Sequence, residues 1–255
     1  MTNTSTAQPD WNAVLNGILA IDCSTCIANV CLASLPQKDE MPQYQRLQMS
    51  DSLARAFLGV AEEVLRQGKR GLDKNELVLR PYDAGSKPDP HEVEYIHVSD
   101  QGHIKNQLIP LESFLELNEF KQENDFVEGL RFYVIVVQPK EGSPIYFFRS
   151  YSAKREITRS RWDISAVMQE NNYFNRITAP IFLFDKEIDC IVRDERLFIF
   201  DQGNFHKRFR FFEYARQVGD ETLRAIQKVV PIINFESFAN SCRNHGMVQF
   251  RRLLW

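Results

Sequence analysis

The sequence predicts an α+β protein with mostly antiparallel sheets and flanking helices, packed as two lobes. Three observations support this class. The 255 residues are 44% hydrophobic and 25% charged, as in an ordinary globular protein. Short β-prone runs alternate with turn-forming residues, which is typical of antiparallel sheets. Helical periodicity occurs in separate stretches, in both halves of the chain.

The first 42 residues predict a short helix and a buried strand region. Residues 1–10 are polar, and we expect them to be disordered. The apolar run from Trp11 predicts a short helix, followed by one or two buried strands that end at Leu35. Residues 36–42 are interpreted as a loop.

The next segment predicts an amphipathic helix. Its apolar side chains recur at steps of four, three and four, the spacing that places them on one helix face. Ser50 or Asp51 is the expected N-cap, and Gly68 is the expected stop. The apolar positions are Leu53, Phe57, Val60 and Val64.

Residues 76–120 predict a hairpin and a second helix. The β-prone runs 76–82 and 93–98 are separated by the turn-rich residues 83–90, which indicates a surface hairpin. Residues 109–120 predict a short helix that Pro110 opens.

The second half predicts further strands. Residues 132–137 form an unbroken apolar run, so we expect a strand buried on both faces that pairs as a hairpin with residues 145–151. Three more apolar runs, separated by charged turns, predict an antiparallel meander. These runs are residues 181–184, 188–192 and 197–200.

The chain ends in predicted helices. Asp220 is the expected cap of one helix, Pro231 its stop, and Phe235 begins another. We expect the apolar side chains of the final residues to bury against the domain or a second subunit. These are Phe250, Leu253, Leu254 and Trp255.

Charge divides the chain unequally. Residues 1–148 hold 13 Lys and Arg against 21 Asp and Glu, whereas residues 149–255 hold 18 against 13. Together with the charged connector 121–129, this division predicts an acidic N-terminal lobe over residues 11–128 and a basic C-terminal lobe over residues 129–255. The basic lobe is expected to meet an anion such as nucleic acid.

The densest basic run is RSYSAKREITRSR at 149–161, which contains one acid, Glu156. Guanidinium groups bind phosphate bidentately and release condensed counterions, so the run suits a polyanion backbone. The alternative is a solvated loop that pairs with the acidic half. The candidate phosphate ligands are Arg149, Lys154, Arg155, Arg159 and Arg161.

A second basic group lies in FHKRFRFF at 205–212. In a helix, the phenylalanines would share the buried face; in a strand, alternate basic residues would share one face. Both arrangements set cations beside aromatic rings and suit binding along a nucleic-acid backbone. The alternative is that the phenylalanines are core and the cations only solvated. The candidate ligands are Lys207, Arg208 and Arg210.

Metal and cofactor signatures are weak, and we expect neither a metal nor a cofactor. The five cysteines are odd in number and predict free, mostly buried thiols in a reducing compartment. Cys23, Cys26 and Cys31 have no fourth zinc ligand nearby, and His91, His97 and His103 are interpreted as solvated. Nucleotide-binding, serine-hydrolase and zincin motifs are missing from the sequence.

One enzymatic alternative remains open, a metal-dependent nuclease. Acids crowd the predicted meander, and carboxylates can hold Mg²⁺ for phosphodiester hydrolysis. Only Asp189 is predicted to lie within a strand, while the others belong to turns. The acids are Asp185, Glu187, Asp189, Asp194 and Glu195.

The N-terminus does not resemble a signal peptide, because the first cation is Lys38. The apolar stretch 18–35 contains polar side chains that would be costly in a bilayer, so it does not predict a membrane span. We expect a cytoplasmic protein whose membrane contact depends on a partner.

From Pro144 onward, the order of patterns resembles the KwaB family, the cytoplasmic component of the Kiwa anti-phage system. The similarity covers the second half well and the first half in outline. It is carried by PIYFFRSY from Pro144, IFLFD at 181–185, IDCIV at 188–192, LFIF at 197–200 and FHKRFRFFEYA at 205–215.

The resemblance implies a defence protein that binds DNA without strong sequence preference and acts with the membrane-embedded protein KwaA, which would recruit it to the inner membrane. The acidic lobe is then the expected surface for KwaA or for self-association, as a homodimer or a higher homo-oligomer. Family members tend to continue into a further β-rich end beyond the helix that corresponds to residues 235–254. A protein scaffold that never touches nucleic acid is the remaining alternative.

Overall fold

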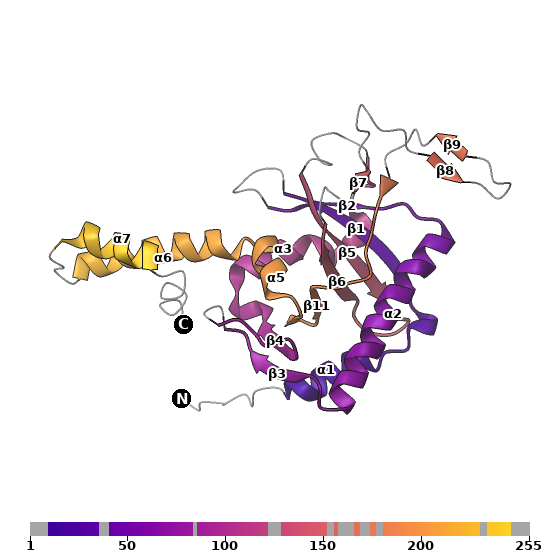
Figure 1. Ribbon diagram of the computed structural model, residues 1–255, viewed down its shortest axis with the longest axis horizontal. Helices are drawn as coiled ribbons and strands as arrows, with labels where there is room; N and C mark the ends of the chain where they lie inside the picture. Colours follow the sequence, from indigo (N-terminus) through magenta and orange to yellow (C-terminus); the bar gives the residue numbers. More distant parts are fainter. Residues whose placement is uncertain are drawn as a thin grey trace.

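An eight-stranded sheet runs through the centre of the protein in the computed structural model (Figure 1). The strand order is β2-β1-β5-β6-β11-β12-β4-β3, and every neighbouring pair is antiparallel except β3 and β4. The strands are β1 (Ile27–Ser34), β2 (Gln43–Arg46), β3 (Val78–Pro81), β4 (Glu92–His97), β5 (Leu130–Gln138), β6 (Ile145–Ser150), β11 (Cys190–Arg193) and β12 (Arg196–Ile199).

Helices and two small sheets complete the described structure. The structure describes residues 10–35, 41–83, 86–121, 129–151, 156–157, 166–168, 174–176, 181–229 and 234–245. The helices are α1 (Trp11–Leu19), α2 (Asp51–Asp73), α3 (Gly102–Glu112), α5 (Gln202–Arg208), α6 (Phe211–Val229) and α7 (Phe235–His245), with 3₁₀ turns η1 (Cys23–Thr25), η2 (Val98–Asp100) and η3 (Phe114–Glu116). The small sheets pair β7 (Glu156–Ile157) with β10 (Ile181–Phe182), and β8 (Ala166–Met168) with β9 (Phe174–Arg176).

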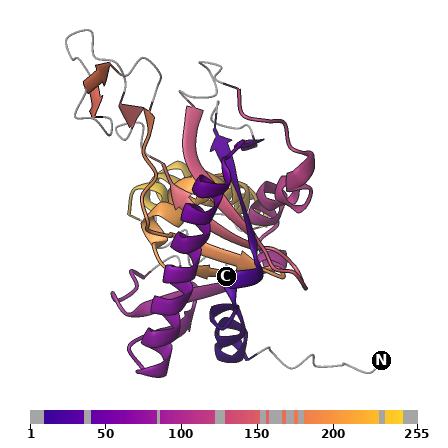
Figure 2. The same ribbon diagram turned by 90° about the vertical axis from the view of Figure 1, so that its right-hand side faces the viewer.

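Helices cover both faces of the large sheet, and alternate strand residues therefore belong to two cores. Phe57 and Leu65 of α2 pack with Leu15 of α1 against one face, and Figure 2 shows α2 lying across that face. Ile104 of α3 and Phe205 of α5 pack against the other face. The α+β class with a mostly antiparallel sheet is thus confirmed. The pair α6 and α7 extends away from the sheet (Figure 1).

The predicted amphipathic helix is confirmed at its start and wrong at its end. The Ser50 hydroxyl accepts a hydrogen bond from the Leu53 backbone N–H, so Ser50 is the N-cap. The helix continues through Gly68 to Asp73. A Cβ at Gly68 would lie 2.8 Å from Cδ2 of Leu19, so the glycine permits close packing of α2 on α1 and does not end the helix.

Two predictions between residues 76 and 120 are wrong in detail. The strands β3 and β4 do pair, but they run parallel, so they form no hairpin. Alternating apolar residues predict a strand without fixing its direction. The helix α3 begins at Gly102 and ends at Glu112, and Pro110 lies in its last turn instead of its first.

The second half follows its predicted strands more closely. The β5–β6 hairpin is confirmed, and six consecutive residues of β5 are buried. The hairpin of β11 and β12 confirms two strands of the meander, but β10 pairs with β7 in a separate sheet. Asp220 lies inside the continuous helix α6 and is not a cap, whereas α7 begins at Phe235 as predicted.

The sheet joins the two predicted lobes. β1 pairs with β5, and β4 pairs with β12, so strands from both sides of residue 128 are neighbours. The two-lobe arrangement is not confirmed, and the division at residue 128 stays a prediction. Residues 1–9, the connector 122–128 and the final residues 246–255, whose apolar side chains we expected to bury, lie outside the described residues.

Two further predictions concern the state of the cysteines and the hydropathy of the helices. Cys23, Cys26, Cys31 and Cys190 are free and buried. In the part of the chain that the structure describes, no helix is both long enough and apolar enough to cross a membrane.

Candidate nucleic-acid interface and its anchor

Four of the eight predicted phosphate ligands belong to the segment between β6 and β10, which we call the basic segment (residues 152–180). Lys154, Arg155, Arg159 and Arg161 lie outside the described residues. The structure does describe the residues that adjoin this segment at both ends, and it also describes the other four predicted ligands.

Arg149, near the end of β6, is buried with 7% of its surface exposed. Its guanidinium donates to the carboxylates of Asp185 at 2.8 Å, of Asp189 at 2.5 Å and of Glu187. A guanidinium that already contacts three carboxylates has few donors left for a phosphate, and it lies inside the protein. Arg149 therefore acts as an internal ion-pair partner and is not retained among the phosphate ligands.

Asp189, immediately before β11, is fully buried and fully hydrogen-bonded. Its carboxylate accepts bonds from the Ser150 backbone N–H at 2.6 Å, the Ser150 hydroxyl at 2.7 Å and the Asn204 amide at 3.0 Å, in addition to Arg149. Burial alone would raise the pKa of Asp189, but the charge of Arg208 and the bonds from Ser150 outweigh burial and lower it. Asp189 is therefore a buried carboxylate in its ionised form.

The six residues around these bonds form what we call the anchor network. They are Arg149, Ser150, Asp185, Glu187, Asp189 and Asn204. Two of them precede the basic segment, three follow it, and Asn204 comes from α5. The network thus ties both ends of the basic segment to the same end of the large sheet.

Aromatic packing supports the same two ends. The Tyr151 ring lies 6.3 Å from the Phe182 ring and 6.1 Å from the Phe184 ring. The Tyr133 hydroxyl on β5 donates to the Asp185 carbonyl at 2.9 Å. Residues on both sides of the basic segment are therefore held by the hydrophobic core as well as by charge.

Residues 205–208 are helical in α5, but residues 209–210 form a turn before α6, so the helical interpretation of residues 205–212 is confirmed only in part. The three cations are separated in this arrangement. Arg208 is buried with 2% of its surface exposed; its guanidinium carbon lies 4.2 Å from the Phe148 ring centroid, and Nη2 donates to the Cys190 sulfur at 2.9 Å. This geometry is a cation–π contact inside the core, so Arg208 is not retained as a phosphate ligand.

Lys207 and Arg210 remain near the surface. Lys207 is exposed in the last turn of α5, three residues after Asn204 and so on the same helix face. Arg210 is half-buried with φ of 48° at the junction of α5 and α6. The contact between Asn204 and Asp189 thus brings the face of α5 that carries Lys207 toward the ends of the basic segment.

The five meander acids fall into two groups at opposite ends of β11. Asp185, Glu187 and Asp189 converge on Arg149. Asp194 and Glu195 form the turn before β12, both with positive φ, and bond to Ser143 and Lys105 respectively. Within the described ranges, no group of three or more His, Cys, Asp or Glu side chains is placed to hold a metal ion.

Sequence reasoning missed the partners that complete the network, Ser150 and Asn204. Asn204 had one local signal, since Asp201 is the N-cap of α5 and its carboxylate accepts from the Asn204 N–H at 2.8 Å. That spacing predicts a helix start at Asp201, but it does not reveal the contact with Asp189.

These features define an α+β protein with one mixed sheet and an internal charge network at the base of a basic segment. The family model described as Kiwa protein KwaB-like matches residues 128–254, about half of the chain. The chain belongs to the KwaB family, whose name associates it with the Kiwa anti-phage system. No curated protein and no solved structure matches the chain.

Proposed function

We propose that this protein binds duplex DNA through the phosphate backbone, without strong sequence preference, as part of Kiwa defence. The observation that carries the proposal is the anchor network, which fixes both ends of the segment that holds four of the predicted phosphate ligands. Phosphate contacts need positive charge held in register with the backbone and no base-specific geometry. The retained ligands are Lys154, Arg155, Arg159, Arg161, Lys207 and Arg210.

The charge of the second half supports the same proposal. Residues 149–255 hold 18 Lys and Arg against 13 Asp and Glu. Arg149 and Arg208 neutralise internal carboxylates or contact aromatic rings, so they do not add to the surface charge. The affinity is therefore expected to depend on the cations of the basic segment, with Lys207 contributing from α5 and Arg210 from the turn before α6.

The test is a titration of fluorescent duplex DNA at several salt concentrations without Mg²⁺. The binding constant of the wild-type protein should fall with salt at a logarithmic slope of about −0.9 per neutralised phosphate. A variant with Lys154, Arg155, Arg159 and Arg161 all changed to Glu should lose binding.

A matched variant controls for net charge. Changing Arg55, Arg66, Arg70 and Lys74 to Glu alters the charge equally, but the first three are exposed on α2 and Lys74 is its exposed C-cap residue. It should retain the wild-type slope to within about one unit. Equal loss in both variants would mean that only overall charge matters, and no salt-dependent binding by the wild type would favour the scaffold alternative.

We also propose that the protein acts with KwaA at the inner membrane and assembles as a homodimer or a higher homo-oligomer. Family membership supports the first expectation, and the acidic character of residues 1–148 offers a surface for either contact. Co-expression with KwaA should move the protein into the membrane fraction, and light scattering of the protein alone should give more than one 29.8 kDa chain. A cytosolic monomer under both conditions would contradict the proposal.

A further inference from the structure

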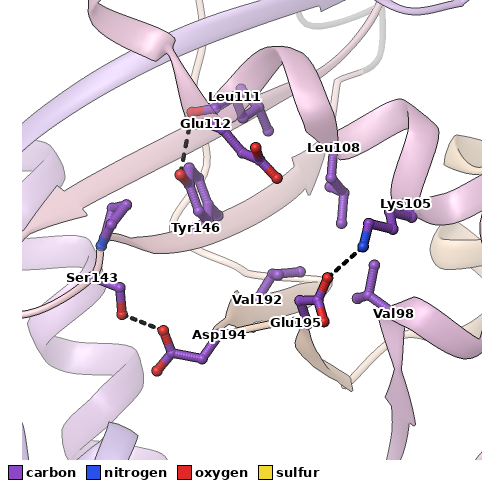
Figure 3. A pocket seen from close by; sticks show the side chains of 11 residues that line it. Val98, Lys105, Leu108, Leu111, Glu112, Ser143, Tyr146, Val192, Asp194 and Glu195 are labelled. Carbon is purple, nitrogen blue, oxygen red and sulfur yellow. Dashed lines mark hydrogen bonds and ion pairs between the residues drawn. The ribbon is translucent and has the colours of Figure 1, made fainter.

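A pocket of about 300 Å³ lies between α3, the start of β6 and the turn from β11 to β12 (Figure 3). Its floor is apolar and is formed by Val98, Leu108, Leu111 and Val192. The ring of Tyr146 forms a wall, and charged side chains surround the opening. An apolar pocket with a few placed polar groups is the usual form of a binding site.

Three carboxylates and one ammonium group line the pocket, so negative charge is in excess there. Lys105 Nζ lies 2.7 Å from Glu195 Oε1, and the Ser143 hydroxyl donates to Asp194, which also lies near Arg193. Glu112 is exposed, points into the opening in Figure 3, and forms no ion pair with any residue that the structure describes. The pocket therefore favours a cation over an anion.

Tyr146 adds a second feature that attracts a cation. Its hydroxyl donates to the Leu111 carbonyl at 3.2 Å, which holds the ring against the pocket. Burial, and secondarily the charge of Glu112, raises the pKa of Tyr146 to about 12, so the phenol stays neutral at physiological pH. A ring face beside a carboxylate is a favourable site for a guanidinium or an ammonium group.

Two exposed apolar side chains, each three residues from Glu112 in the sequence, indicate a protein as the source of that cation. Ile109 is 49% exposed and lies three residues before Glu112 on the same face of α3, and Leu115 is 61% exposed in η3. Apolar surface around a pocket suits a partner that covers the rim as well as filling the pocket. A small cationic metabolite would leave these side chains in water.

We propose that the pocket receives one Arg or Lys side chain of a protein partner, with apolar neighbours of that side chain covering Ile109 and Leu115. The pocket lies at the end of β6 and β11 that is opposite the anchor network, because Ser143 precedes β6 and Asp194 follows β11. The six residues of β6 span about 20 Å. Partner docking and DNA binding would thus use separate ends of the sheet, and this proposal does not rest on DNA binding.

The test uses the full chain with ¹³C-labelled Leu and Val methyl groups and a peptide probe without DNA. The probe is acetyl-Gly-Leu-Arg-Leu-Gly-amide, and its control has Glu in place of Arg. The arginine peptide should shift the methyl signals of Val98, Leu108, Leu111 and Val192, and the glutamate peptide should shift them far less. Equal shifts from both peptides, no shift, or shifts confined to other methyl groups would overturn the proposal.

A charge reversal distinguishes binding in the pocket from general attraction of the peptide to an acidic surface. Glu112→Lys should weaken binding of the arginine peptide about fivefold or more, since it removes an attraction and adds a repulsion. The matched variant Glu116→Lys changes an exposed acid in η3, outside the pocket lining, and should bind within about twofold of wild type. Unchanged binding by Glu112→Lys, with the remaining methyl spectrum intact, would also overturn the proposal. DNA affinity should be the same in wild type and Glu112→Lys. The peptide titration therefore tests the pocket, and the DNA titration tests the DNA proposal, independently of each other.

Discussion

Arg149 shows how a single cation can matter to DNA binding without touching DNA. Its guanidinium offsets carboxylates at Asp185, Glu187 and Asp189, and Asp189 is fully buried. Removing one partner of a buried ion pair leaves an uncompensated charge, whereas surface pairs contribute little. The stability of the segment ends should therefore depend on Arg149 far more than on the exposed ion pairs of α2.

Arg149→Met should lower the free energy of unfolding by about 3 kcal/mol, because Asp189 keeps its charge and loses its closest counterion. Urea unfolding at pH 7 measures the change. Arg193→Met is the matched control: Arg193 lies 3.7 Å from Asp194 in a half-exposed pair, and its loss should cost about 1 kcal/mol or less. Similar losses in the two variants would show that the network contributes no more than a surface pair.

A second single residue, His103, should make the stability of the protein depend on pH. The interpretation of His103 as solvated is wrong, because its side chain on α3 is half-buried, and burial lowers its pKa to about 4. Between pH 6.5 and 4 the unfolded chain binds the proton and the folded protein does not, so stability falls as the pH is lowered through this window. From pH 7 to pH 5 the loss should be about 2 kcal/mol, measured by urea unfolding. His103→Gln should remove most of that loss, and an unchanged pH dependence in this variant would contradict the assignment.

At the scale of elements, two of the three glycines of α2 differ in what surrounds them. Gly59 is exposed, and a Cβ there would meet nothing within 4 Å, whereas at Gly68 it would lie 2.8 Å from Leu19. Gly59→Ala should therefore stabilise the protein by about 0.5–1 kcal/mol through helix propensity. Gly68→Ala should destabilise it, because overpacking against buried Leu19 outweighs that gain. Thermal unfolding of both variants measures the difference, and equal stabilisation would mean that Leu19 yields without cost.

The same element shows what local patterns can and cannot predict. Apolar spacing and the Ser50 cap locate the start of α2 because both signals act within a few residues. The role of Gly68 depends on α1, which is distant in the sequence, so the glycine is easily interpreted as a stop. The strands β5 and β6 are predictable because a continuous apolar run is needed where both sheet faces are covered. The parallel pairing of β3 with β4 has no comparable local signal.

The anchor network likewise could not be predicted from local sequence patterns. A dense run of cations and a cluster of acids are both visible in the sequence, and taken separately the first predicts phosphate binding while the second suggests metal binding. The structure joins Arg149 from the first group to Asp185 and Asp189 from the second, across more than thirty residues. Charge density along the chain therefore locates a region of interest, and burial decides which charges face inward.

At the scale of the whole molecule, the KwaB-like half does not contain the complete sheet. The family match covers residues 128–254, yet β5 pairs with β1 and β12 pairs with β4, which both lie before the match. Without these neighbours, β5 and β12 would become open, largely apolar edges. The same half would also lose α1 and α2, which cover one face of the sheet.

We therefore expect a fragment of residues 128–254 to lack cooperative unfolding, because it exposes one sheet face and two new strand edges. Co-expression with a fragment of residues 1–127 should restore a stable complex, since the two pieces regain the β1–β5 and β4–β12 pairings. Urea unfolding followed by circular dichroism, and co-purification through a tag on one fragment, measure these outcomes. A cooperative transition in the 128–254 fragment alone would mean that its own core is sufficient for folding. The first half would then be an added cover, and DNA binding could be assigned to the KwaB-like fragment in isolation.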